Sequence, residues 1–182
     1  ASVARAPTWD GVADAELVAR ARAGDRWAAE APFRKHVEFV MGLAVRLLRN
    51  RDEAEDVVQD AFVDAFGGLG ALSDGASWRS WLSGIVVHKA HRRFRRRKLL
   101  SLLGLYSSSH DTMLAAGAQP GISPELHAEV VRLDAALSRV PDGQRAAWLL
   151  RYVEGYSLDE VARFCGCSLS TAKRRLAGAA SG

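Results

Sequence analysis

Apolar residues recur three and four positions apart over most of the chain, and this spacing is the strongest constraint on its fold. The spacing matches one face of an α-helix, which has about 3.6 residues per turn. Sustained alternation with period two, the mark of a half-buried strand, is not found. We therefore predict an all-α protein. The clearest stripes are Val37, Val40, Met41, Ala44, Val45 and Leu48, and then Ala54, Val58, Ala61, Phe62 and Ala65.

The helical spacing is interrupted once, which predicts two small helical domains. The first covers residues 14–98, after a flexible N-terminal segment of residues 1–13. Over residues 99–122 the spacing fades and serine and glycine are common, so we expect a flexible linker there. A Ser-Pro-Glu sequence typical of a helix start then opens the second domain, residues 123–182.

The composition limits the function classes. A hydrophobic content of 48% predicts a packed core, but no apolar run approaches the about 18 residues of a membrane span. Two cysteines are too few for a disulfide framework and favour a reducing cytoplasm. A phosphate loop, a nucleophile motif and a histidine–carboxylate catalytic set are all missing from the sequence. We expect neither an enzyme nor a cofactor or metal site, and the net charge of +4 allows nucleic-acid binding.

An acidic strip stands out in this basic chain. Its carboxylates share one side of a predicted helix, opposite the apolar stripe. Such a face repels phosphate and suits a basic protein surface. The alternatives are a solvated face and a carboxylate metal site, although nothing nearby completes a metal site. The strip consists of Asp52, Glu53, Glu55, Asp56, Asp60 and Asp64.

A basic run follows in the next predicted helix, where seven of the ten residues from 89 to 98 are lysine or arginine. As a phosphate-binding surface it would supply affinity without reading sequence, and the alternative is a solvated helix end. Trp78 and Trp81 lie upstream, beside the glycine-rich stretch 67–77, and exposed aromatic rings can stack on unpaired bases. Trp78 shares a helix face with Leu82, however, so core packing is the stronger expectation for Trp78.

A helix-turn-helix pattern occupies the C-terminal part. Ser157 and Glu160 have capping-box spacing, and Gly166 can end that helix in a left-handed conformation. Ser168 can cap the next helix, which would enter the DNA major groove. The alternative is a helical hairpin with a solvated basic face. A redox or metal role for Cys165-Gly166-Cys167 would need more ligands, so we expect these cysteines to be small buried side chains.

Together these motifs resemble bacterial sigma factors, in particular the small extracytoplasmic-function group. The similarity covers about residues 14–98 and 125–176, in the family's order. The family's acidic helix matches residues 53–66, and its Ser-Phe-Arg-x-Trp-Leu segment matches residues 77–82. The segment before the helix-turn-helix matches at Val140-Pro141, Gln144-Arg145, Ala147 to Leu150 and Arg151 to Gly155.

The resemblance implies two partners, core RNA polymerase and promoter DNA, and allows an anti-sigma factor as a third. It implies core binding by Asp52, Glu53, Asp56, Gln59, Asp60 and Asp64. It implies contacts to the start-proximal promoter element by Trp78, Arg79, Trp81, Lys89, Arg92, Arg93, Arg95, Arg96 and Arg97. It implies contacts to the upstream element by Ser168, Ser170, Thr171, Lys173, Arg174 and Arg175, with Ser170, Thr171 and Arg174 nearest the bases.

The sequence departs from the family pattern at a few positions. Ser83 and Gly84 stand where an aromatic residue and an arginine are frequent, and His88 stands in place of an asparagine. Gly84 inside a helix costs about 1 kcal/mol relative to alanine. After Leu176 the usual further arginines are replaced by small residues, which keeps open an adaptor that no longer binds DNA. The other alternative is a stand-alone helix-turn-helix regulator, which has no evident need for the acidic strip.

Overall fold

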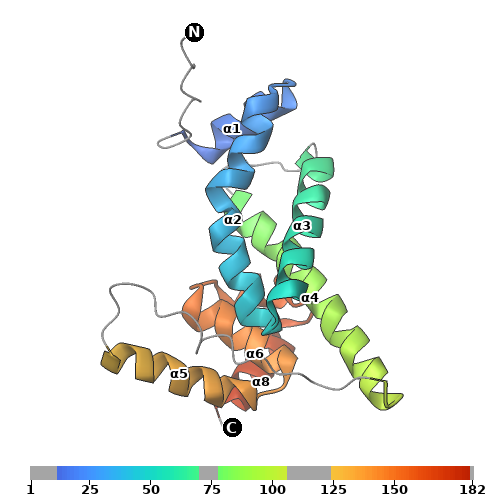
Figure 1. The fold of residues 1–182 in the computed structure, drawn as a ribbon, viewed down its shortest axis with the longest axis vertical. Helices are drawn as coiled ribbons and strands as arrows, with labels where there is room; N and C mark the ends of the chain where they lie inside the picture. Colours follow the sequence, from blue (N-terminus) through green and yellow to red (C-terminus); the bar gives the residue numbers. More distant parts are fainter. Residues whose placement is uncertain (1–11, 70–77, 106–123, 181–182) are drawn as a thin grey trace.

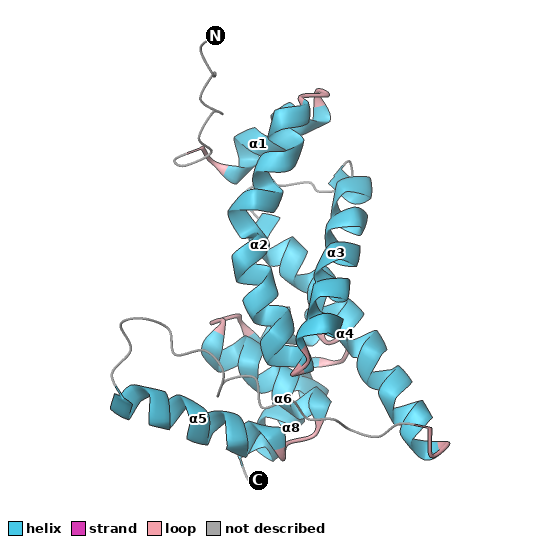
Figure 2. Cartoon of the chain, in the orientation of Figure 1, coloured by secondary structure: helices cyan, strands magenta, loops and turns pink. Residues whose placement is uncertain are grey.

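The computed structural model describes residues 12–69, 78–105 and 124–180, and within these ranges the chain consists of helices and connecting loops (Figures 1 and 2). The all-α prediction is confirmed. Within the described ranges, no helix combines the length and the apolar character needed to cross a bilayer. The elements are α1 (Asp14–Arg22), α2 (Arg26–Leu48), α3 (Arg51–Gly68), α4 (Trp78–Leu102), α5 (Pro124–Ser138), α6 (Asp142–Trp148), the π-helical turn η4 (Leu149–Val153), α7 (Leu158–Phe164) and α8 (Leu169–Ala180).

Helices α1 to α4 form the N-terminal unit, and side-chain caps set two of their starts. Asp25 accepts hydrogen bonds from the amides of Trp27 and Ala28 at the start of α2, and Asn50 accepts one from Glu53 at the start of α3. Helix α4 extends to Leu102, past residue 98, into the segment in which we expected the linker. Residues 103–105 continue as a turn, and residues 106–122 of that segment lie outside the described residues.

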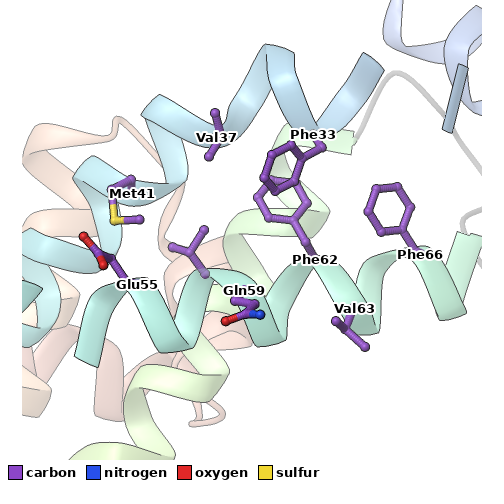
Figure 3. Close-up of a pocket in the computed structure, with 9 residues that line it drawn as sticks. Phe33, Val37, Met41, Glu55, Gln59, Phe62, Val63 and Phe66 are labelled. Atoms are coloured by element: carbon purple, nitrogen blue, oxygen red, sulfur yellow. The ribbon is translucent and has the colours of Figure 1, made fainter. Parts of the chain in front are cut away.

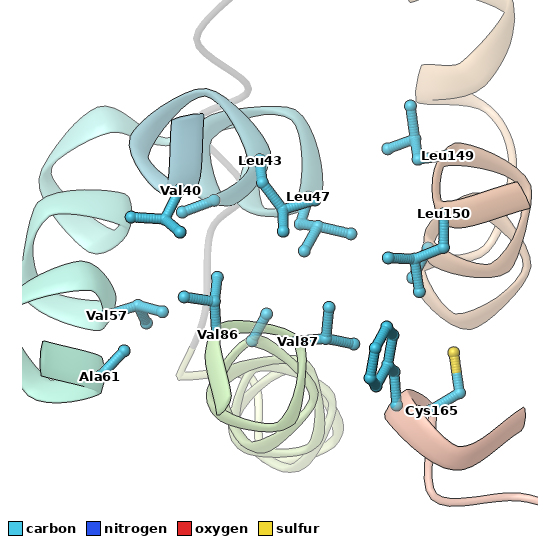
Figure 4. Packing of buried hydrophobic residues seen from close by; sticks show 14 of the residues in the cluster. Val40, Leu43, Leu47, Val57, Ala61, Val86, Val87, Leu149, Leu150 and Cys165 are labelled. Carbon is cyan, nitrogen blue, oxygen red and sulfur yellow. The ribbon is translucent and has the colours of Figure 1, made fainter. Parts of the chain in front are cut away.

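One hydrophobic core joins the two parts of the chain (Figure 4). Both predicted apolar stripes face inward: the stripe on α3 is buried throughout, and the stripe on α2 is buried or half-buried. The core continues from α4 into η4, where Leu149 and Leu150 are buried, and on to Cys165 at the end of α7. The described parts of the two predicted domains are therefore packed against each other.

The C-terminal unit, α5 to α8, contains the predicted helix-turn-helix. Ser157 and Glu160 form the capping box at the start of α7. Gly166 in the turn has φ +58°, the left-handed conformation that only glycine adopts at little cost. The hydroxyl of Ser168 accepts from the amide of Thr171 at 3.3 Å and caps α8. These local predictions are confirmed.

Polar contacts fasten the C-terminal unit to the end of α2. Arg49, itself in a left-handed conformation with φ 55°, donates to the carboxylate of Asp134, with Nη2 to Oδ2 at 2.9 Å. The buried Arg145 donates to the carbonyl of Leu47 at 2.9 Å. Arg46 pairs with Glu154, whose side chain is almost fully buried. These contacts cross from one unit to the other and hold α6 and η4 against α2.

Ser83 and Gly84, two residues of α4 that depart from the family pattern, lie where α7 and the turn before it approach α4. A Cβ atom at Gly84 would come within 3.1 Å of the ring of Phe164, so glycine allows the close approach. The hydroxyl of Tyr156 donates to the Ser83 hydroxyl at 2.7 Å. The departures from the family pattern at these two positions therefore accommodate the C-terminal unit.

Candidate functional site

Helices α3 and α4 run antiparallel, and their charged stripes meet along the line of contact. Spacing of three or four residues places each set of charges on one helix face. Glu53 binds Arg97 at 2.7 Å, Asp56 binds Arg93 at 3.4 Å, and Asp64 binds Lys89 at 2.7 Å. We refer to these six residues as the charge ladder. Half of the predicted core-binding residues thus contact the predicted DNA-binding helix of the same chain.

The other three predicted core-binding residues are exposed. Asp52, Gln59 and Asp60 point away from the core, and within the described ranges Asp52 and Asp60 form no ion pair. Glu55, the remaining carboxylate of the strip, pairs with Arg51 one turn away at 2.8 Å. The outer side of α3 therefore presents unpaired carboxylates to solvent.

An apolar groove between α2 and α3 borders this acidic side (Figure 3). It has a volume of about 460 Å³, and the rings of Phe33 and Phe62 lie 4.3 Å apart in its wall. Glu55 and Gln59 also line it. This groove was not predicted from the sequence. The available signal was Val63, an apolar residue that lies outside the buried stripe and is 66% exposed.

A second, polar groove separates α3 from the basic part of α4. Its volume is about 350 Å³, and the exposed Asp60 lines it together with four cationic side chains of α4. Arg92 and Arg96 are exposed, and within the described ranges they form no ion pair. The same holds for Arg95 and Lys98. The groove is lined by Val57, Asp60, Lys89, Arg92, Arg93 and Arg96.

The start of α4 holds the aromatic residues of the predicted site. Trp78 is fully buried, so its side chain belongs to the core, as its shared face with Leu82 indicated, although the resemblance places it among the DNA contacts. Trp81 is half-buried, and its ring centroid lies 5.4 Å from that of Trp78. The exposed guanidinium of Arg79 stacks 3.8 Å from the ring of Phe39. The preceding residues, 70–77, lie outside the described residues.

Helix α8 presents most of the residues predicted to contact the upstream element. Ser170, Lys173 and Arg174 are exposed, and Thr171 is half-buried. Arg175 differs from them, because its Nη1 atom lies 3.8 Å from the sulfur of Cys167 and its guanidinium packs near Gly143. Arg175 thus points toward the interior of the C-terminal unit, whereas the sequence placed it near phosphates.

Two titratable groups lie near Arg175: His91, which is half-buried, and Cys165, which is buried. Burial, with a further contribution from the Arg175 cation, lowers the pKa of His91 on α4 to about 4. Burial raises the pKa of the Cys165 thiol to about 11, so this thiol remains protonated and packs as a small apolar group. Among the described residues, histidine, cysteine and carboxylate side chains do not gather closely enough anywhere to hold a metal ion.

Comparison with known proteins identifies both parts of the chain. The family Sigma-70 region 2 matches residues 32–99, and the family Sigma-70, region 4 matches residues 131–179. The ECF RNA polymerase sigma factor SigM of Mycobacterium tuberculosis is 35% identical over 167 residues, which cover 91% of this chain and 80% of SigM. The RNA polymerase sigma factor CarQ of Myxococcus xanthus is 32% identical over 157 residues, covering 86% of this chain and 87% of CarQ.

Solved structures share the fold. RpoE of Bartonella quintana, crystallised with the anti-sigma factor NepR, superposes with a TM-score of 0.64 at 24% identity, covering 82% of this chain and 89% of RpoE. CnrH, solved in complex with the cytosolic domain of CnrY, gives a TM-score of 0.61 at 23% identity and covers 92% of each chain.

A helical bundle with charged faces, followed by a helix-turn-helix, is the fold of a helical DNA-binding protein. The two matched sigma-70 regions narrow this class of protein further. The chain belongs to the sigma-70 family of RNA polymerase sigma factors, in its extracytoplasmic-function group. It is a sigma factor, which binds core RNA polymerase and directs promoter recognition and transcription initiation. Factors of this kind start transcription without catalysing it. The alternative of a stand-alone regulator is not favoured, because both sigma regions are present in order.

Proposed function

We propose that three surfaces of this chain divide the work of a sigma factor. The outer side of α3 binds core polymerase, the exposed cations of α4 bind promoter phosphates, and the exposed start of α8 reads the upstream element as duplex DNA. The observation that carries this proposal is that unpaired charges of opposite sign lie on different helices. Unpaired carboxylates face solvent on α3, while exposed cations lie on α4 and α8.

The acidic side of α3 suits a basic protein surface. Asp52 and Asp60 are exposed and have no ion pair within the described ranges, so a partner does not have to displace an internal contact to reach them. Phosphates are repelled by this side, whereas complementary charge raises the association rate and sets the register of a protein complex. The apolar groove beside Gln59 offers additional area that a partner side chain can cover.

The remaining surfaces suit DNA. Arg92, Arg95 and Arg96 are exposed on α4 and supply charge that attracts phosphates of any sequence. Ser170 and Arg174 are exposed near the start of α8, the part of a recognition helix that enters the major groove in this motif. Both structural neighbours were solved with a second protein, and we include an anti-sigma factor as a further partner of this chain. Because bacterial RNA polymerase works in the cytoplasm, the proposal places the chain there.

The test is the affinity for core RNA polymerase of the Asp52→Lys/Asp60→Lys variant. Two attractive contacts become repulsive, and like charges brought together at an interface cost several kcal/mol, so we expect core affinity to fall by well over tenfold. The control is Glu38→Lys/Glu129→Lys, which makes the same charge change at two exposed positions on α2 and α5.

Thermal midpoints separate binding from folding in this test. Exposed substitutions usually change stability by about 0.5 kcal/mol, so both variants should melt close to the wild type. A normal midpoint with lost core binding supports the assignment of α3. Core binding that is equal in the variant, the control and the wild type would make the strip a solvated face.

A further inference from the structure

The acids of the charge ladder lie outside the cations that they bind. The side chain of Asp64 is 58% exposed, whereas that of its partner Lys89 is 14% exposed. Asp56 is 64% exposed and its partner Arg93 is 27% exposed. A molecule approaching α3 from solvent therefore meets the carboxylates first, and the cations lie underneath them.

Helix α4 consequently carries two kinds of cation. Lys89, Arg93 and Arg97 are held by carboxylates of α3, and Arg97 also donates to the carbonyl of Leu48 at 3.1 Å. The other four cations of the basic run are exposed and have no ion pair within the described ranges. These four, which we call the free cations, are Arg92, Arg95, Arg96 and Lys98.

We propose that the carboxylates of the charge ladder are exchangeable counter-ions that mask part of the DNA-binding face until core polymerase binds. In the free chain they neutralise Lys89, Arg93 and Arg97. When a basic surface of the polymerase engages the carboxylates, these cations become available to promoter phosphates. The inference rests on the proposed role of α3 as the core-binding side, and it couples the two binding events through shared residues.

The energetics allow such an exchange. Ion pairs that solvent reaches contribute about 0–1 kcal/mol each, and the exposed acids Asp56 and Asp64 form such pairs, so a new cationic partner can compete for them. The Glu53–Arg97 pair is more enclosed, because its side chains are 24% and 16% exposed. Each cation that binds a DNA phosphate releases counter-ions and adds about 0.9 to the slope of log affinity against log salt. A masked cation adds nothing to that slope, because its charge is already balanced. The salt slope therefore counts how many cations of α4 are unmasked.

The first test uses the free full-length chain and a short DNA duplex of random sequence. In the Asp56→Asn/Asp64→Asn variant, Arg93 and Lys89 lose their carboxylates. We expect tighter binding and a slope steeper by about 1.8, from two cations at about 0.9 each. The control, Glu38→Gln/Glu129→Gln, raises the net charge equally at exposed positions away from the ladder, and its slope should equal that of the wild type. Equal slopes for the variant and the control would overturn the inference.

The second test compares the free chain with the holoenzyme, using single alanine variants. Arg92→Ala removes a free cation and should reduce the slope by about 0.9 in both states. Lys89→Ala should leave the slope of the free chain unchanged and reduce that of the holoenzyme by about 0.9 on a promoter duplex. A reduction in the free chain, or none in the holoenzyme, would contradict the exchange.

The experiments distinguish failure of the proposed core-binding role of α3 from failure of the masking proposal. If α3 does not bind core polymerase, Asp52→Lys/Asp60→Lys retains core affinity while the random-duplex result still reports the masking in the free chain. If the masking is absent, the random-duplex slopes of variant and control coincide while the core-binding result is unaffected. Loss of the folded state in Asp56→Asn/Asp64→Asn is detected by its thermal midpoint, and the Lys89→Ala comparison then decides the question.

Discussion

Helices α4 and α8 both carry clustered cations, but they hold them differently. Three cations of α4 form ion pairs with the neighbouring α3, whereas Lys173 and Arg174 of α8 are exposed and, among the described residues, make no ion pair. Of the three cations on α8, only Arg175 is turned inward, toward Cys167. The helix-turn-helix can therefore meet DNA as it stands, while the basic face of α4 is partly balanced inside the protein.

The neighbours of the two helices explain the difference. Helix α3 lies along α4 with carboxylates at helical spacing, so ion pairs form along the contact. Helix α8 contains no acidic residue and packs on α6 through small side chains: Gly178 faces Gln144, and Gly143 faces Arg175. Whether a basic helix can act as a binding surface therefore depends on the helix packed beside it as well as on its own sequence.

The largest expected effect concerns the contact that fastens the unit containing α8 to the unit containing α4. Asp134→Ala leaves the buried cation of Arg49 without its carboxylate, and breaking a buried pair in this way costs about 3 kcal/mol or more. Chemical denaturation measures the loss. The matched control is Glu55→Ala, which removes an exposed pair with Arg51 and should cost about 1 kcal/mol or less. Equal small losses would mean that water reaches Arg49 and that the two units separate in solution.

A pH dependence of stability is the next effect in size. His91 lies between the units, and the charged groups around it are Arg175 on α8, Arg95 and His88 on α4, and Asp142 on α6. Burial lowers its pKa from 6.5 to about 4, so the unfolded chain binds the proton more tightly than the folded chain. Its contribution to stability is thus present above pH 6.5, is lost as the pH falls toward 4, and amounts to at most about 3 kcal/mol.

Chemical denaturation of the wild type and of His91→Gln at several pH values isolates the contribution of His91 to the free energy of unfolding. The difference between the two proteins should shrink between pH 6.5 and 4 and should stay constant at lower pH. The exposed His88, replaced in the same way, provides the control. A constant difference across this range would show that His91 titrates like a solvated histidine.

The third prediction contrasts base reading on α8 with phosphate binding on α4. Arg174→Ala should cost about 1–3 kcal/mol on the preferred upstream element and relax the preference at one base pair. Arg92→Ala should weaken all sequences alike, because phosphates carry no sequence information. Binding of the holoenzyme to promoters with single base-pair changes measures both. An equal loss on every sequence for Arg174→Ala would move this residue to the phosphate contacts.

The sequence predicted those features that residues close together in the chain determine. The capping box of Ser157 and Glu160 and the left-handed Gly166 depend on neighbours within one helical turn, and each is present. The apolar stripe of α3 and the burial of Trp78 follow from helical period alone. The helix-turn-helix was predictable for the same reason.

Contacts between distant residues could not be predicted in this way. Glu53 and Arg97 are 44 positions apart, and each helix read by itself gives no indication that its charged stripe faces the other. Gly84 was interpreted as a destabilising residue because its reason, the ring of Phe164, comes from another part of the chain. The inward turn of Arg175 likewise depends on the packing of α8 against α6. Periodicity gives the faces of a helix, and tertiary packing decides what each face meets.

Run-off transcription with purified core RNA polymerase is the most direct test of the central claim that the surfaces of α3, α4 and α8 act together in one sigma factor. The assay compares core polymerase alone, with this protein, and with its Arg174→Ala or Asp52→Lys/Asp60→Lys variant, on a promoter selected by the holoenzyme. We expect a discrete transcript only when the protein is present, a weaker one with Arg174→Ala and almost none with the α3 variant. Full transcription by the α3 variant, or DNA binding by the wild type without any stimulation of core polymerase, would contradict this account.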